Sequence, residues 1–76
     1  MLTAIYNALK ALVSRIPLDK VAKFLKWAWD LAVAAAAKTY EQALKILNFI
    51  KNNPGKIVDW FLKGYSVYEI IRMILG

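Results

Sequence analysis

Hydrophobic residues recur every three or four positions along most of this chain, and no stretch alternates hydrophobic and polar residues for long. That spacing places the hydrophobic residues on one face of an α-helix, and it predicts helices along the whole sequence. The first predicted helix covers residues 2–16. Pro17 is expected to end it, because proline fits the first turn of the following helix and disrupts a helix interior. The hydrophobic face of this first helix consists of Leu2, Ile5, Tyr6, Leu9, Leu12, Val13 and Ile16.

A second helix is predicted from Leu18 to about Ala37, since the alanine-rich stretch at its end strongly favours helix. Asp19 lies near the start of this helix, where a negative charge is favourable. The small side chains toward its end would let a neighbouring helix approach closely. The hydrophobic stripe predicted for this helix consists of Leu18, Val21, Ala22, Leu25, Ala28, Trp29, Ala32 and Val33.

Two short motifs predict where later helices begin. "TYEQ" at Thr39–Gln42 and "SVYE" at Ser66–Glu69 each place a hydroxyl residue three positions before Gln or Glu, which is the pattern of a capping box. Between them, "NNPG" at residues 52–55 is expected to end the third helix. Pro54 then suits the start of a fourth helix, and Gly64 suits its end.

Four to five short amphipathic helices joined by tight turns predict a compact all-α bundle, with residues 1–76 forming one helical-bundle domain. The chain has no cysteine for disulfide bonds, so its stability has to come from packing. Its hydrophobic fraction of 61% supplies that packing and exceeds the roughly 45–50% of an ordinary soluble domain. The excess favours a partner such as a membrane or a second subunit. The core is expected to include Leu9, Leu25, Trp29, Leu47 and Phe61.

The chain offers almost no residues for catalysis or metal binding. It has neither histidine nor cysteine, which removes the usual zinc, haem and thiolate ligands, and its five carboxylates are scattered along the sequence. Ser14 and Ser66 lie near helix ends, and "NPGK" at residues 53–56 lacks the other residues of a phosphate-binding loop. We therefore expect no enzyme activity, no metal site and no cofactor.

The net charge of +6 indicates a polyanionic partner, which means nucleic acid or an anionic membrane. A DNA-recognition helix would be rich in Arg, Asn, Gln and Lys, whereas the last helix offers Arg72 alone among Ile and Met, so nucleic acid is not expected. The longest uncharged hydrophobic run in the middle of the chain, Leu31–Ala37, is far shorter than the roughly 20 residues that span a bilayer. The N-terminal segment lacks the basic start of a signal peptide. The sequence thus predicts a soluble chain whose composition suits contact with a membrane.

One pattern recurs, in which a lysine stands four residues before an aromatic residue. Residues four apart share a helix face, so each such pair would place a cation beside a ring. Trp27 is expected on the polar face of its helix, and Trp60 at the edge of a hydrophobic stripe between Lys56 and Lys63. The four pairs are Lys20–Phe24, Lys23–Trp27, Lys45–Phe49 and Lys56–Trp60.

This pattern suits the surface of a bilayer. Indole prefers the interfacial zone, and each lysine near an anionic membrane contributes on the order of 1 kcal/mol. The alternative is that the lysine stems only shield half-buried rings in a small bundle. The candidate membrane-binding residues are Lys20, Lys23, Trp27, Lys45, Phe49, Lys56, Trp60 and Lys63.

A longer stretch supports a family resemblance. "GKIVDWFLKG" at Gly55–Gly64, followed by a final helix that ends in "ILG" at residues 74–76, resembles the leaderless bacteriocins of the aureocin and lacticin Q type. Those peptides carry a Gly-Lys-Ile-Leu-Asp-Trp-like stretch, and "KWAWDLA" at residues 26–32 is similar to their Trp-Ala-Trp segment. This chain departs from the family in its additional N-terminal helix, greater length, shorter final helix and lower charge for its size. The positions that match the family are Trp27, Trp29, Lys56 and Trp60.

The resemblance implies a compact saposin-like bundle, a fold that circular bacteriocins share, and synthesis without a leader, secretion, and permeabilisation of the membranes of related Gram-positive bacteria. We therefore expect an antimicrobial bacteriocin that binds the anionic lipids of bacterial membranes through its Lys/Trp surface and self-associates on the membrane. The alternative is a helical protein-interaction or lipid-binding module. Dye leakage from anionic and zwitterionic vesicles would distinguish the two.

Overall fold

The computed structural model describes residues 1–76 and consists of helices and turns, with no β-strand. The predicted all-α bundle is therefore confirmed. Two short 3-10 turns, Val13–Arg15 and Leu18–Lys20, separate the first two helices. The five α-helices are α1 (Leu2–Lys10), α2 (Val21–Ala36), α3 (Tyr40–Asn52), α4 (Pro54–Leu62) and α5 (Val67–Leu75).

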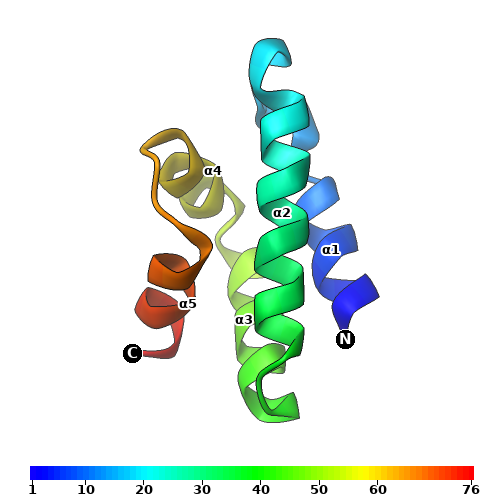
Figure 1. Cartoon of the computed structure of the whole chain (residues 1–76), viewed down its shortest axis with the longest axis vertical. Coiled ribbons are helices and arrows are strands. Elements are labelled where there is room, and N and C mark those ends of the chain that lie inside the picture. The colour runs from blue at the N-terminus through cyan, green and yellow to red at the C-terminus, as the bar shows by residue number, and fades with distance from the viewer.

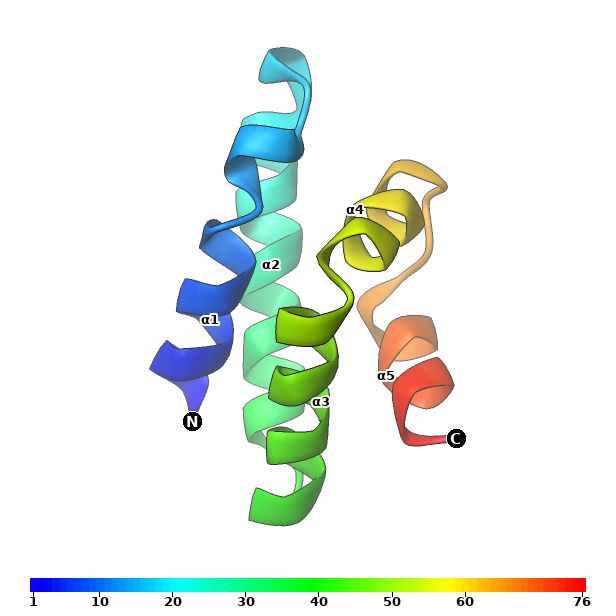
Figure 2. The same cartoon turned by 180° about the vertical axis from the view of Figure 1, so that it is seen from behind.

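The longest helix, α2, forms the middle of the bundle. Figure 1 shows α1 running beside α2 on one side, with α4 and α5 on the other side. The view from behind shows that α3 returns antiparallel to α2 and leads into α4 (Figure 2). Helix α3 contacts α1, α2 and α5, so it joins the two sides of the molecule, whose extents are 34 × 22 × 20 Å.

The core contains only hydrophobic side chains, because no polar or charged residue is buried. The small residues of α2 belong to this core: Ala28, Ala32 and Ala35 are completely buried. Leu9, Leu47 and Phe61 are buried as predicted. The nineteen buried residues are Ile5, Leu9, Leu12, Ile16, Phe24, Ala28, Leu31, Ala32, Ala35, Ala43, Ile46, Leu47, Ile50, Ile57, Phe61, Val67, Ile70, Ile71 and Ile74.

Both predicted capping boxes are present. At the start of α3, the Gln42 N–H donates to Thr39 Oγ1 at 3.2 Å, and the Thr39 N–H donates to Gln42 Oε1 at 3.4 Å. The Ser66–Glu69 box forms the same two bonds at 3.2 and 3.0 Å at the start of α5. After α4 the chain turns at Gly64, whose φ of +88° lies in the left-handed region that favours glycine.

The first predicted helix is too long. Helix α1 ends at Lys10, and the chain then passes through a 3-10 turn to Ile16, which is extended with φ −100° and ψ 134°. A residue before proline is driven out of the helical region by the proline ring, which explains the extended Ile16. Helix α2 starts only at Val21, and Leu18, predicted on its hydrophobic stripe, is 93% exposed.

The prediction of which face of α2 is buried is only partly right: Ala28 and Ala32 of the predicted stripe are buried, but the buried face is rotated away from Leu25 and Trp29. The buried positions start at Phe24 and continue along one face, whereas Leu25 is only partly buried and Trp29 is 46% exposed. The two residues were expected in the core, and neither belongs to it. Helix α2 carries hydrophobic residues on almost every side, so its sequence alone does not show which face is buried. Packing against the other helices determines the buried face, since the Phe24 ring meets the Phe61 ring edge-on at 5.0 Å.

Candidate functional site

The candidate membrane-binding residues other than Lys63 form two groups on different sides of α4. Adjacent residues on a helix point about 100° apart, so Trp60 and Phe61 face different neighbours. Trp60 faces Phe49 of α3, and Phe61 faces Trp27 of α2. We call Lys45, Phe49, Lys56 and Trp60 the Trp60 cluster, and Lys20, Lys23 and Trp27 the Trp27 cluster.

In the Trp60 cluster, two aromatic rings stack at the junction of α3 and α4. The Phe49 and Trp60 centroids lie 5.5 Å apart with 5° between the ring planes. The Lys56 Nζ lies 5.9 Å from the Trp60 centroid, and Lys45 is exposed one turn before Phe49. Both rings are half-buried, so each keeps an edge at the surface beside an exposed lysine. As predicted, Phe61 is buried and Trp60 lies at the edge of the hydrophobic face of α4, with Lys56 and Lys63 exposed. Ile57 is buried as well.

In the Trp27 cluster, the aromatic ring is part of the fold. The Trp27 Nε1–H donates to the Tyr65 carbonyl at 3.1 Å, which ties α2 to the turn after α4. The Trp27 ring also packs against Phe24 at 5.7 Å and against Phe61 at 5.2 Å. Lys20, Lys23 and Trp27 line a surface hollow of about 280 Å³ together with residues that follow on α4 and its turn. Trp27 was expected to project from the polar face, and that expectation is wrong, because the ring is half-buried and bound on two sides.

Only one of the four predicted lysine–aromatic pairs has the geometry of a cation–π interaction, and that pair is Lys56–Trp60. The Lys20–Phe24 pair does not form a cation–π interaction, because Phe24 is completely buried. A further cation–π pair has the opposite order: Lys10 Nζ lies 5.1 Å from the Tyr6 centroid. Helical side chains lean toward the N-terminus, so a later lysine leans naturally over an earlier ring.

Lys63 belongs to neither cluster. Its Nζ lies 3.0 Å from Asp59 Oδ2, and the hydrogen bond to Asp59, together with the charge of that carboxylate, raises the pKa of Lys63 above its ordinary value. The second ion pair joins Lys26 to Asp30 at 3.5 Å.

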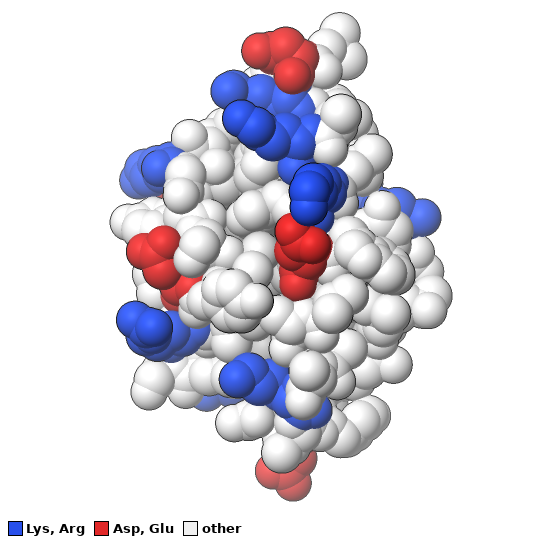
Figure 3. Space-filling view, viewed as in Figure 1, with Lys and Arg blue, Asp and Glu red and all other residues white.

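Most of the positive charge is free of acidic partners. Of the eleven lysines and arginines, only Lys26 and Lys63 lie within ion-pair distance of a carboxylate, so nine have no such partner. Figure 3 shows that on one face the Lys and Arg side chains, paired and unpaired together, lie in several separate places, with acidic side chains and wide uncharged surface between them.

An exposed hydrophobic face on α2 and α5 was not predicted from the sequence. Trp29 and Val33 of α2 are 46% and 45% exposed, and Tyr68 of α5 is 71% exposed. The one aromatic ring that packs against Trp29 is that of Tyr6 of α1, edge-on at 5.2 Å. No spacing in the sequence singles out this face, because hydrophobic residues occur on almost every side of α2, and only contacts with neighbouring helices leave Trp29 outside the core.

The structure contains no group of acidic side chains close enough to hold a metal ion. None of the helices combines the length and the hydrophobicity that a bilayer-crossing segment requires. No protein-family model, curated protein or solved structure matches this chain.

Proposed function

We propose that this chain is an antimicrobial, bacteriocin-like protein that is secreted, binds anionic bacterial membranes and permeabilises them. The observation that carries the proposal is the Trp60 cluster, in which an exposed ammonium group lies 5.9 Å from an indole that stacks on a second ring. The resemblance of Gly55–Gly64 to leaderless bacteriocins, which includes Lys56 and Trp60, agrees with it.

The indole and the lysines of this cluster each have a physical role at a bilayer. Indole partitions into the interfacial zone, and lysine stems lie along hydrophobic surface while their ammonium groups reach lipid phosphates. A lysine near an anionic surface contributes about 1 kcal/mol, so the nine cations without an acidic partner would give useful binding without a receptor. In water, the Lys56 ammonium group lies over the Trp60 ring, and it can move aside when lipid phosphates attract it.

Permeabilisation requires a second step in which hydrophobic side chains reach the acyl chains. The core supports this step, because it contains no buried polar group that would oppose transfer into lipid. Helix α4 carries Trp60 outside and Ile57 and Phe61 inside, so a movement of α4 at the bilayer would bring both sets into contact with lipid. Self-association of several chains would then be needed to disturb the bilayer over a larger area.

One observation favours a second candidate, a helical protein-interaction module. Trp29, Val33 and Tyr68 form an exposed hydrophobic face, and such faces often mark protein interfaces. A module of this kind would bind one partner in a saturable complex and would leave vesicles intact.

Dye leakage from vesicles tests the proposal. We expect leakage from vesicles of phosphatidylglycerol and phosphatidylcholine, and much less from phosphatidylcholine alone. Raising the salt from 0.1 to 1 M shortens the screening length from about 10 Å to about 3 Å and should reduce leakage from the anionic vesicles. Intact anionic vesicles at low salt would contradict the proposal and would favour the interaction module.

A further inference from the structure

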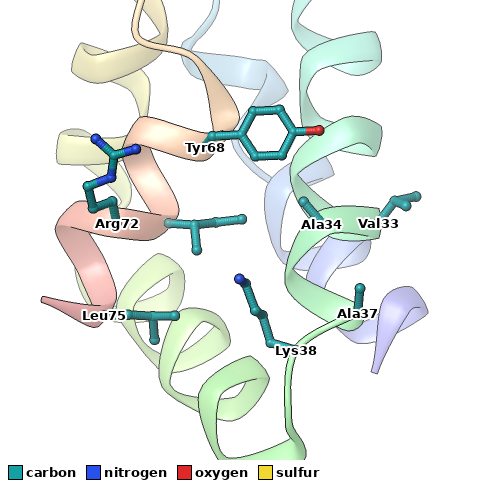
Figure 4. Close-up of a pocket in the computed structure, with 8 residues that line it drawn as sticks. Val33, Ala34, Ala37, Lys38, Tyr68, Arg72 and Leu75 are labelled. Atoms are coloured by element: carbon teal, nitrogen blue, oxygen red, sulfur yellow. The ribbon is translucent and has the colours of Figure 1, made fainter.

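A hollow lies between the C-terminal half of α2 and α5, away from both lysine–aromatic clusters. Its volume is about 600 Å³, and six of its eight lining residues are hydrophobic. Figure 4 shows Leu75 on the α5 side, Ala34 and Ala37 on the α2 side, and the Tyr68 ring reaching from α5 toward α2 above them. Small side chains on α2 keep this space open.

Positive charge lies at this hollow without a matching acid. Its two charged lining residues are Lys38 and Arg72, and neither has a carboxylate within ion-pair distance. Lys38 extends into the space between the two helices, whereas Arg72 points away on the outer side of α5 (Figure 4). Glu69, one turn before Arg72, already accepts the capping hydrogen bond from the Ser66 N–H at 3.0 Å. The hollow therefore combines a hydrophobic wall with an uncompensated cation.

The size and lining of the hollow restrict its occupant. A volume of about 600 Å³ holds little more than one turn of a helix about 10 Å wide, so a helix docked here would enter the hollow with its side chains alone. An extended peptide would lack backbone partners, because the lining segments are helical and the N–H groups of Ala37 and Lys38 already donate to Val33 and Ala35 carbonyls. A single hydrocarbon chain needs no hydrogen bonds and is narrower than a helix, so it suits both the size and the lining of the hollow.

We propose that this hollow binds one acyl chain of an anionic phospholipid, with the lipid phosphate on the Lys38 ammonium group. Arg72 stands at the rim, where it adds to the attraction of the phosphate. This inference goes beyond permeabilisation and does not depend on it, since a chain that leaves vesicles intact can still bind a lipid monomer in the hollow.

Binding of lipid monomers tests the inference on the full chain. The probe is lauroyl lysophosphatidylglycerol below its micelle concentration, followed by NMR shifts of the Ala34, Ala37, Ile71 and Leu75 methyl groups. We expect a saturable 1:1 titration with shifts concentrated on these residues. Lauroyl lysophosphatidylcholine, which has the same chain and no net charge, should bind at least several-fold more weakly, and inorganic phosphate should not shift these methyl groups.

Two variants with matched controls test the wall and the charge separately. Ala37→Trp fills the hollow and should abolish the titration, whereas Ala22→Trp at an exposed position of α2 should leave it unchanged. Lys38→Gln should weaken binding by about tenfold or more, which is the effect of losing one charged hydrogen bond, whereas Lys51→Gln should change it little.

Each contrary result would overturn the inference. No saturable binding by the native chain, or full binding by Ala37→Trp with a native spectrum, would show that the hollow is not the lipid site. Equal binding of the two lauroyl lipids would remove the anionic lipid as the occupant. The same methyl shifts with inorganic phosphate would show that the anion alone is recognised.

Discussion

The Trp60 ring lies parallel to the Phe49 ring, with 5.5 Å between their centroids, so the junction of α3 and α4 presents two stacked aromatic edges at the surface. Its neighbour in sequence, Phe61, points into the core and meets Phe24 and Trp27. The two adjacent aromatic residues of α4 therefore have different roles. One residue belongs to the surface that we propose for membrane binding, and the other holds α4 on the bundle.

This separation predicts opposite effects for two alanine variants. Phe61→Ala removes a ring that is only 9% exposed and should lower the free energy of unfolding by about 3–5 kcal/mol. Trp60→Ala removes a ring that is only half-buried and should cost less than Phe61→Ala, although stacking on Phe49 adds about 0.5–1.5 kcal/mol to the contribution of its buried area. Trp60→Ala should nevertheless lose most of the leakage activity. Thermal unfolding and vesicle leakage measure the two effects, and a larger loss of stability for Trp60→Ala would mean that the two faces are assigned wrongly.

Trp27 and Trp29 should differ in what they contribute to stability. Trp27→Phe keeps a ring but removes the indole N–H that binds the Tyr65 carbonyl at 3.1 Å, and it should cost about 0.5–1.5 kcal/mol. Trp29→Phe is the matched control, since Trp29 is exposed and makes no hydrogen bond, and it should cost less than about 0.5 kcal/mol. Urea unfolding compares them. If Trp29→Phe is the more damaging variant, the orientation of α2 described above is wrong.

The capping box of α3 should be measurable by itself. Thr39→Ala removes the hydroxyl that accepts the Gln42 N–H at 3.2 Å, and it should lower the free energy of unfolding by about 1 kcal/mol. Thr3→Ala, inside α1, removes an exposed hydroxyl that makes no hydrogen bond and serves as the control. Equal effects of the two variants in urea unfolding would show that the box does not stabilise the helix.

The capping box of α5 predicts sensitivity to acid. The hydrogen bond from the Ser66 N–H is the main reason why the pKa of Glu69 lies below its ordinary value of 4.5. Because the pKa is lower in the folded state, ionised Glu69 stabilises the fold above the unfolded pKa, and this contribution disappears as the pH falls through the folded pKa. Glu69→Gln does not titrate, so its melting temperature should decline less below about pH 4.5 than that of the native chain. Glu41→Gln, which removes a carboxylate outside any capping bond, should decline as the native chain does, and identical acid profiles for all three would refute the prediction.

Local sequence signals predicted the starts of α3, α4 and α5 correctly, whereas the start of α2 at Val21 and its buried face depend on packing. A capping box involves residues three apart, so Thr39 and Ser66 could be recognised without knowing the fold. The faces of α4 could also be predicted, because Ile57 and Phe61 are one turn apart on a short helix. Helix α2 is different, since hydrophobic residues occur almost all round it, and only the neighbours that fold against it decide that Phe24 is buried and Trp29 exposed.

The candidate site shows the same division. The Lys56–Trp60 pair lies within one helix and was predicted from its spacing, whereas the stacking of Phe49 on Trp60 joins two helices and could not be. The hydrogen bond from Trp27 to Tyr65 crosses 38 positions in sequence, which is why Trp27 was expected on the polar face. Spacing in the sequence predicts which residues share a helix face, and tertiary contacts determine whether that face is exposed or covered.

A pair of charge-matched variants separates the Trp60 cluster from positive charge in general. Lys45→Gln with Lys56→Gln lowers the net charge by two from +6 and removes the cation above Trp60. Lys10→Gln with Lys51→Gln lowers it equally and removes the cation above the Tyr6 ring of α1. All four lysines are exposed and without an ion pair, so neither double variant should change the fold.

Leakage from phosphatidylglycerol-containing vesicles, measured for these two double variants at equal concentration, tests most directly whether the Trp60 cluster is the surface that binds the membrane. The account predicts that the Lys45/Lys56 variant loses most of its leakage activity, while the Lys10/Lys51 variant stays close to the native chain. Equal leakage activity of the two double variants, at a reduced or at the native level, would contradict this prediction. The position of the lysines beside Trp60 would then have no effect on leakage.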